Sequence, residues 1–273
     1  MENPDTQRVR LTLHYDGADF LGWQLQPQKR TVQGELERVL ARLLTSPARV
    51  IGSGRTDRGV HATGQVATVD VPIRWTPAEL RRAMNALLPA DVWVAEARLA
   101  PPRFHPRYDA VSRAYIYRVG TATDAQSPFH ARWCWPVVRP LDRGAMERAT
   151  TVLRGEHSFF AFAKAGQEAR GDRCIVQEAL WHDWEPLGLE FRISANRFLH
   201  HMVRYLVGTL VEIGLGRRPG EDLARLLDRE TELETSPPAP PDGLFLTEVR
   251  YPAERSVVAG SGSVGATSQP ATA

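Results

Sequence analysis

The fold is indicated first by an alternating stretch near the N-terminus, Arg8-Val9-Arg10-Leu11-Thr12-Leu13-His14-Tyr15. Apolar side chains at every second position are typical of a β-strand that buries one face. Asp16-Gly17 ends the stretch, and Thr31 is a suitable N-cap for a helix whose apolar positions between residues 32 and 44 form one stripe. A strand followed by an amphipathic helix is therefore the first part of the predicted fold.

The same kind of order continues along the chain. We expect a strand at Gln65–Val71, a helix opened by the capping box of Thr76 and Glu79, and a strand at Val92–Leu99. A similar order follows: a strand at Ala114–Val119, a helix at Asp142–Arg154, strands at Cys174–Trp184 and Leu189–Ala195, helices at Phe198–Ile213 and Glu221–Arg229, and a strand at Leu244–Tyr251. The pattern predicts an α+β fold of two units, residues 7–107 and 108–252, each a sheet with helices on one face. Residues 253–273 are rich in Ser, Gly, Ala, Thr and Pro and are predicted to be a disordered tail.

Composition excludes several classes of protein. Cys134 and Cys174 are the only cysteines, too few for a disulfide framework or a zinc site, so a reducing compartment is expected. No apolar run follows Met1, and none is long enough to span a bilayer. We therefore predict a cytoplasmic protein that does not associate with membranes.

The formal net charge of +2 is distributed unevenly. Residues 1–107 carry 15 basic and 11 acidic side chains, whereas residues 108–252 carry 18 and 20. Arginine accounts for 32 of the 34 basic residues. Its planar guanidinium is suited to binding phosphate through two hydrogen bonds. A GC-rich genome would also enrich a protein in arginine. The positive half predicts an anionic partner, with Arg30 and Arg58 contributing salt-dependent affinity.

A candidate site lies in Gly52-Ser53-Gly54-Arg55-Thr56-Asp57-Arg58-Gly59-Val60-His61. The glycines allow the backbone to turn between two predicted strands. Arg55 and Arg58 could bind phosphate oxygens and keep Asp57 ionised, which suggests chemistry on a nucleic acid. A surface turn with a local salt bridge would contain the same residue types.

Three further residues could face the same site. Tyr115 and Tyr117 lie two positions apart on a predicted strand and share a face, where they could stack a base or simply pack. Leu244, at the start of the last strand, could wall a pocket or join a core.

Polar residues also open the helix predicted over residues 198–213. Arg204 interrupts its apolar stripe, so it either pairs with an anion or extends to the helix edge. His200 and His201 are adjacent and should diverge around a helix, and no metal-binding spacing is present, so no metal site is expected.

In this order the segments resemble the tRNA pseudouridine synthase A family. The seven matching pieces, between residues 9 and 251, are Tyr15-Asp16-Gly17 with Gly22-Trp23-Gln24, Gly54-Arg55-Thr56-Asp57-x-Gly59-Val60-His61, Asn85-Ala86-Leu87-Leu88-Pro89, Phe104-His105-Pro106-Arg107, Tyr115-x-Tyr117, Phe198-Leu199-His200-His201-Met202-Val203-Arg204 and Gly243-Leu244-Phe245-Leu246. Arg58, Ala114 and Arg197 depart from the usual pattern beside matched positions, which bears on RNA specificity rather than on catalysis.

The resemblance implies an isomerase that converts uridine to pseudouridine at positions 38, 39 and 40 of the tRNA anticodon stem-loop. It implies a homodimer that needs no cofactor and no metal. Each chain would hold two ferredoxin-like, RRM-like subdomains with mainly antiparallel sheets and an active cleft between them.

The resemblance also implies roles for individual residues. Asp57 matches the catalytic nucleophile, Arg204 the arginine that pairs with it, and Tyr115 the tyrosine that stacks the uracil and could act as a base. The expected substrate-binding residues are Arg55, implicated in RNA handling, the pocket wall Leu244, and their neighbours Arg58 and Tyr117.

Two other functions fit parts of the sequence. Paired α+β sheets with exposed aromatic residues also occur in RNA-binding proteins of RRM-like architecture that catalyse nothing. A glycoside or nucleoside hydrolase would use Asp57 with a second carboxylate, and no second acid stands out in the matching segments.

Overall fold

The computed structural model describes residues 5–164, 171–228 and 232–252. The strands are β1 Thr6–Tyr15, β2 Ile51–Gly52, β3 His61–Pro72, β4 Val92–Leu99, β5 Ser112–Gly120, β6 Trp135–Pro136, β7 Gly155–Ser158, β8 Arg173–Trp184, β9 Gly188–Ala195 and β10 Leu244–Arg250. The α-helices are α1 Val32–Leu44, α2 Pro77–Leu87, α3 Pro128–Ala131, α4 Arg143–Thr150, α5 Met202–Gly214 and α6 Asp222–Arg225. The predicted tail after residue 252 and Arg229 lie outside the described residues.

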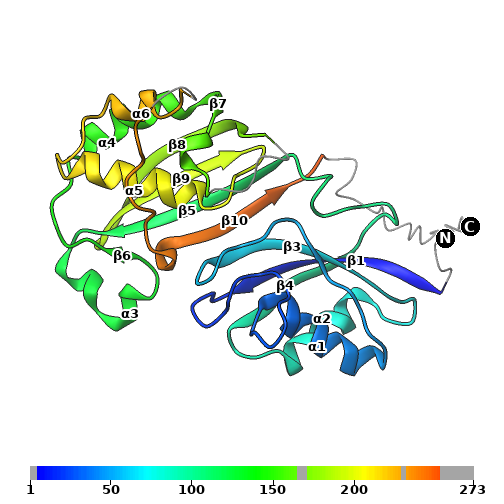
Figure 1. Ribbon diagram of the computed structural model, residues 1–273. Coiled ribbons are helices and arrows are strands. Elements are labelled where there is room, and N and C mark those ends of the chain that lie inside the picture. Colours follow the sequence, from blue (N-terminus) through cyan, green and yellow to red (C-terminus); the bar gives the residue numbers. More distant parts are fainter. Residues whose placement is uncertain (1–4, 165–170, 229–231, 253–273) are drawn as a thin grey trace, which may run out of the picture.

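Over these residues the strands form one ten-stranded sheet, with the order β4-β1-β3-β10-β5-β9-β8-β7 and with β2 and β6 paired to β3 and β5 (Figure 1). Most pairs are antiparallel, so the α+β class with a mainly antiparallel sheet is confirmed. The expectation of one sheet per unit is wrong, because β10 pairs with both halves. It runs parallel to β3, with Phe245 opposite His61, and antiparallel to β5.

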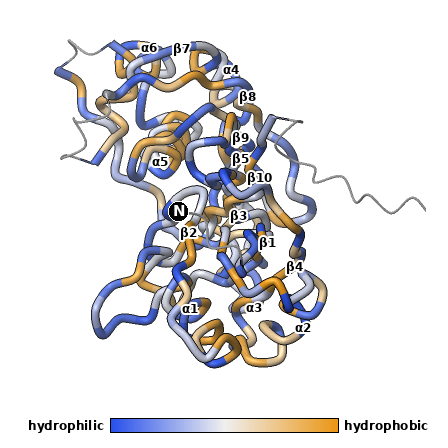
Figure 2. Tube along the Cα trace, turned by 90° about the vertical axis from the view of Figure 1, so that its right-hand side faces the viewer, coloured by the Kyte–Doolittle hydropathy of each residue, from blue (hydrophilic) through white to orange (hydrophobic). Residues whose placement is uncertain are grey.

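Two hydrophobic cores pack against this sheet. In the first half α1 and α2 cover β1, β3 and β4, and Leu11, Leu36 and Leu80 are fully buried. In the second half α4 and α5 pack with β5, β8 and β9, and Phe191 and Leu210 are fully buried. Figure 1 shows these helices as two groups, and Figure 2 shows hydrophobic residues along the central strands. Each large apolar side chain buried in this way contributes about 1.5–3 kcal/mol to the free energy of folding.

No described helix combines the length and apolar character needed to cross a bilayer.

The first residues of the helices show which local sequence signals were sufficient to predict where a helix begins. Thr31 caps α1 by accepting a hydrogen bond from the Gly34 amide, and Thr76 forms a complete capping box with Glu79 at the start of α2, as predicted. By contrast, α5 begins at Met202 and not at Phe198, because His201 has the left-handed backbone angles φ 66° and ψ 0°. The residues from Phe198 to His201 therefore precede the helix, and this difference shapes the site described below.

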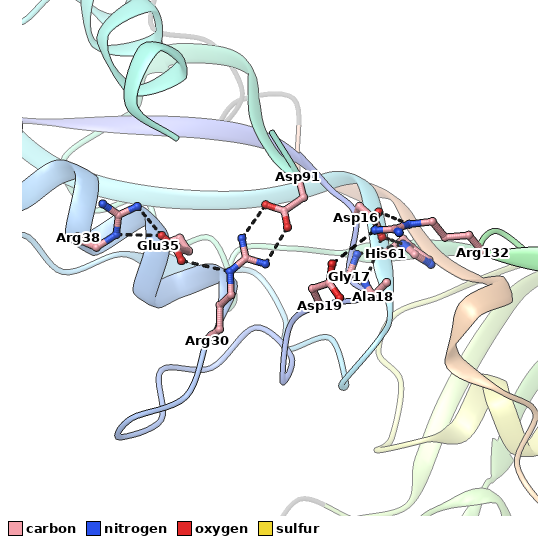
Figure 3. Close-up of polar contacts among 10 residues, drawn as sticks. All are labelled: Asp16, Gly17, Ala18, Asp19, Arg30, Glu35, Arg38, His61, Asp91 and Arg132. Carbon is pink, nitrogen blue, oxygen red and sulfur yellow. Dashed lines mark hydrogen bonds and ion pairs between the residues drawn. The ribbon is translucent and has the colours of Figure 1, made fainter. Parts of the chain in front are cut away.

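Ion pairs fix the end of β1 (Figure 3). Arg132, which follows α3 in the second half, donates from Nε to Asp16 Oδ2 at 2.6 Å and so ties the two halves together. Burial alone would raise the pKa of Asp16, but contacts from His61, the Ala18 amide and Arg132 outweigh it and lower that pKa to about 2.

Arg30 also serves the fold. Its guanidinium donates to both oxygens of Asp91 at 2.7 and 2.9 Å and contacts Glu35 (Figure 3). The same group lies 4.1 Å from the centre of the Phe20 ring. These contacts engage Nε, Nη1 and Nη2 of Arg30 within the protein, and its contribution to phosphate affinity stays a prediction.

Candidate active site

An open pocket of about 840 Å³ brings the two halves of the chain together. The first half contributes residues 53–58, and the second contributes Tyr115, residues 197–203, Leu244 and Leu246. Five of the predicted site residues therefore share one pocket, namely Arg55, Asp57, Arg58, Tyr115 and Leu244. Tyr117 and Arg204 do not line it.

The turn that carries Asp57 is held by buried polar groups. The Ser53 amide donates to the Val66 carbonyl at 2.8 Å, and the Ser53 hydroxyl donates to Gln65 Oε1 at 2.7 Å. Gln65 Nε2 in turn donates to the Gly54 carbonyl at 2.9 Å. Because Ser53 and Gln65 are almost completely buried, these bonds are shielded from water and fix the start of the turn.

The second part of the turn rests on the N-terminal motifs. The Trp23 amide donates to the Thr56 carbonyl at 3.0 Å, and the hydroxyls of Tyr15 and Thr56 are 2.8 Å apart. Gly59 ends the turn with φ 79°, where a Cβ atom would also lie 2.8 Å from Pro241. The turn thus presents the Asp57 side chain, 21% exposed, to the pocket.

The Asp57 carboxylate contacts two histidines. His200 Nε2 lies 3.1 Å from Oδ1, and His201 Nε2 lies 3.4 Å from Oδ2. The prediction that these rings diverge was wrong, because both residues lie in the turn before α5. Burial lowers the pKa of His201, although the charge of Asp57 opposes this, so the ring is neutral at neutral pH.

The predicted pairing of Arg204 with Asp57 is not formed in this structure. Arg204 Nε donates to the Ala239 carbonyl at 2.6 Å, and no ion pair joins Arg204 to Asp57 among the described residues. Its guanidinium instead holds the segment that leads into β10. The two imidazoles meet the carboxylate in its place.

Tyr115 lines the pocket, is partly buried and packs against both cores. The Phe198 ring meets it edge-on, with centroids 5.0 Å apart, and thereby fixes its plane. Burial, together with Tyr15 and the negative charge of Asp57, raises the pKa of Tyr115 well above its usual value, so the phenol is protonated at neutral pH. This environment favours stacking over action as a base.

Tyr117 is not a substrate-binding residue in this structure. It is fully buried in the second core, and its hydroxyl donates to the Pro240 carbonyl at 2.7 Å. Tyr115 and Tyr117 share a face of β5, but the approach to β10 covers the second position. Leu244, opposite Tyr117 in the β5–β10 register, is 5% exposed and lines the pocket.

Arg113 is a site residue that the sequence did not reveal. Its Nη1 donates to the Asn196 carbonyl at 3.0 Å, and its Nη2 donates to the Ser53 carbonyl at 3.2 Å. One guanidinium thus joins the segment before the histidines to the turn that carries Asp57. Arg55 and Arg58 are exposed at the pocket, and neither forms an ion pair with another described residue.

Asp57, His200 and His201 could also ligate a metal ion. One ligand atom from each lies within 4.8 Å of the other two, and two imidazoles with a carboxylate are a common set for zinc. The expectation that the site needs neither metal nor cofactor stays a prediction.

Known proteins match this chain over nearly its whole length. The tRNA pseudouridine synthase family matches residues 12–109 and 149–252. The tRNA pseudouridine synthase A of Latilactobacillus sakei is 40% identical over 248 residues, which cover 90% of this chain and 99% of that protein.

Two other relatives with the same name agree. The protein of Halalkalibacterium halodurans is 42% identical and covers 88% of this chain and 90% of its own length. The protein of Solidesulfovibrio magneticus is 43% identical, with coverage of 89% and 91%. These matches include both segments that meet at the pocket, and the chain accordingly belongs to the tRNA pseudouridine synthase family.

Proposed function

We propose that this protein isomerises uridine to pseudouridine at positions 38, 39 and 40 of the tRNA anticodon stem-loop. The observation that carries the proposal is the position of Asp57, the one carboxylate that the described part of the chain contributes to a pocket also lined by Tyr115, Leu244 and the exposed Arg55 and Arg58. Membership of the family and the name shared by the relatives support tRNA as the substrate.

The reaction breaks the bond from N1 of uracil to C1′ of ribose and forms a bond from C5 to C1′. A proton leaves C5 and N1 gains one, so nothing is oxidised and no atom is lost. Asp57 is the nucleophile in our proposal, and its carboxylate can attack C1′ or the base. Both routes require the uridine to leave the RNA stack, which costs a few kcal/mol.

Tyr115 and Leu244 would hold the detached uracil. Stacking of a base on an aromatic ring is typically worth about 1–3 kcal/mol, which offsets much of the cost of extrusion. Leu244 supplies an apolar wall that keeps the loosened base beside C1′. Arg55 and Arg58, exposed at the same pocket, would bind backbone phosphates or help to extrude the base.

The proposal extends to the whole assembly. Two cores and a pocket lined from both halves support two ferredoxin-like subdomains, residues 7–107 and 108–252, with the active cleft between them. The resemblance adds a homodimer that acts in the cytoplasm.

The test is to incubate the purified protein with unmodified tRNA and to map pseudouridine by carbodiimide labelling and primer extension. We expect modification at positions 38–40, its abolition in Asp57→Asn, and nearly unchanged tRNA binding by that variant. Asp70→Asn, which alters a half-exposed carboxylate on β3 outside the pocket, is the matched control. Release of free uracil would instead indicate a hydrolase, and binding without modification by the unaltered protein would indicate a non-catalytic RNA-binding protein.

A further inference from the structure

The Asp57 carboxylate lies close to two imidazole nitrogens from the opposite half of the chain, one beside each oxygen, at 3.1 and 3.4 Å. We propose that His200 and His201 are positioning residues that orient this carboxylate toward the substrate by donating Nε2–H hydrogen bonds. For its effect on catalysis the inference rests on the proposed function. Neither residue was expected at the site from its spacing.

The placement of the two rings supports a role in orientation. One ring beside one oxygen would leave the carboxylate free to rotate about its Cβ–Cγ bond, whereas a ring beside each of Oδ1 and Oδ2 would restrict that rotation. The atom next to each oxygen is Nε2, so a neutral ring that donates there must carry its proton on Nε2. The remaining lone pairs of the carboxylate are left for the pocket.

The backbone is built to bring both rings to Asp57. His201 has φ 66°, a conformation that residues other than glycine adopt rarely and that is found preferentially at functional sites. The turn is fixed on both sides, because the Lys164 amide donates to the His200 carbonyl and the Tyr205 amide donates to the His201 carbonyl. Helical angles at His201 would continue α5 backward and carry the rings apart.

Loss of a donor should therefore lower kcat and leave tRNA binding almost unchanged, because misplacing a reacting group slows the chemical step. We expect His200→Ala and His201→Ala each to lower kcat about tenfold, with KM for tRNA within about twofold of the unaltered protein. Glutamine carries an N–H donor close to the position of Nε2, so His200→Gln and His201→Gln should restore most of the lost kcat.

The control is His157→Ala, in β7 and outside the pocket, which should leave kcat unchanged. Thermal unfolding of every variant checks that it is folded. The inference is overturned if the alanine variants keep normal kcat, or if the glutamine variants are no better than the alanine variants. It is also overturned if EDTA abolishes activity and Zn²⁺ restores it, because the histidines would then be metal ligands.

A second readout does not depend on activity. Long-range ¹H–¹⁵N spectra of the imidazoles should show protonated Nε2 in both rings, and Asp57→Leu should shift both sets of signals. Protonation on Nδ1 in both rings would overturn the inference even in an active enzyme. If the unaltered protein forms no pseudouridine, the proposed function fails, and these spectra still decide whether the contact exists.

Discussion

The most informative perturbation is Arg113→Met, which keeps most of the aliphatic stem and removes the guanidinium. That group donates four hydrogen bonds to backbone carbonyls, those of Ser53, Arg107, Ala110 and Asn196, at 2.8–3.2 Å. The carbonyls of Arg107 and Ala110 belong to the connection between the halves. The Ser53 carbonyl lies at the start of the Asp57 turn, and the Asn196 carbonyl precedes the histidine turn.

The magnitude follows from these contacts. A hydrogen bond typically contributes about 0.5–1.5 kcal/mol net, and four that share one side chain are not independent. Burial lowers the pKa of Arg113, which shows that the charge costs something to bury and reduces the net gain. We expect Arg113→Met to lower the free energy of unfolding by about 2–4 kcal/mol. In an enzyme of this size that corresponds to a fall in Tm of roughly 5–15 °C.

Urea and thermal unfolding measure this loss, and Arg192→Met is the control. Arg192 lies on the neighbouring strand β9, is half-exposed, and pairs with Glu190 at 2.8 Å. Arg192 is 53% exposed, and the buried Glu190 keeps Arg118 as a second partner at 3.0 Å, so the loss in Arg192→Met should be about 1 kcal/mol. Equal effects of the two substitutions would refute the structural role of Arg113. The pseudouridine assay on folded Arg113→Met should show kcat reduced at least about tenfold. A normal kcat would show that Arg113 holds the fold but not the site.

Three other predictions concern separate parts of the molecule. Tyr115→Phe should keep kcat within about threefold, because the ring that stacks the uracil remains. Tyr115→Ala should lose about 1–3 kcal/mol of stacking. Equal losses of activity in the two variants, measured in the pseudouridine assay, would assign the Tyr115 hydroxyl a role in proton transfer. Because the pKa of Asp16 is lowered to about 2, its stabilisation of about 2 kcal/mol is present above the usual carboxyl range and is lost as the pH falls toward 2. In urea unfolding, Asp16→Asn should therefore be less stable than the unaltered protein at pH 7 but not near pH 2, and a gap that persists near pH 2 would contradict this. Gly64→Ala should cost about 3 kcal/mol or more, because its Cβ would lie 1.9 Å from the Thr247 carbonyl oxygen in β10, whereas Gly54→Ala, with open space around it, should be nearly neutral in the same measurement.

Local patterns were sufficient for most of the secondary structure. The alternation over Val9–Tyr15 and the capping residues Thr31 and Thr76 each depend on neighbours in sequence, and each prediction is confirmed. The pairing of β10 with both β3 and β5 depends on residues far apart in the chain. Alternation shows which face of a strand is buried, and it does not identify the neighbouring strands.

The errors at the site have a related cause. An arginine within an apolar stripe is expected to find a hydrogen-bond acceptor, but a backbone carbonyl can serve as that acceptor just as a carboxylate can, and the sequence does not distinguish the two. Arg204 donates to the Ala239 carbonyl. Arg113 lies in an alternating strand and gives no local sign of its four acceptors. The left-handed angles of His201 were equally hidden, because a sequence signals that conformation clearly only when glycine or asparagine occupies the position.

The parts that the sequence did not reveal act together on one turn. Arg113 donates to the Ser53 carbonyl at the start of the turn, and the two histidines contact the Asp57 carboxylate, so both constraints on Asp57 come from the second half. They can hold it only if the halves keep their separation. The shared strand β10 and the contact between Arg132 and Asp16 maintain that separation at two other places. A motion that parts the halves would therefore break the histidine contacts before it disturbs either core, because those contacts lie at the open pocket and the cores lie within each half. Activity should accordingly be lost under milder denaturing conditions than those that unfold the sheet.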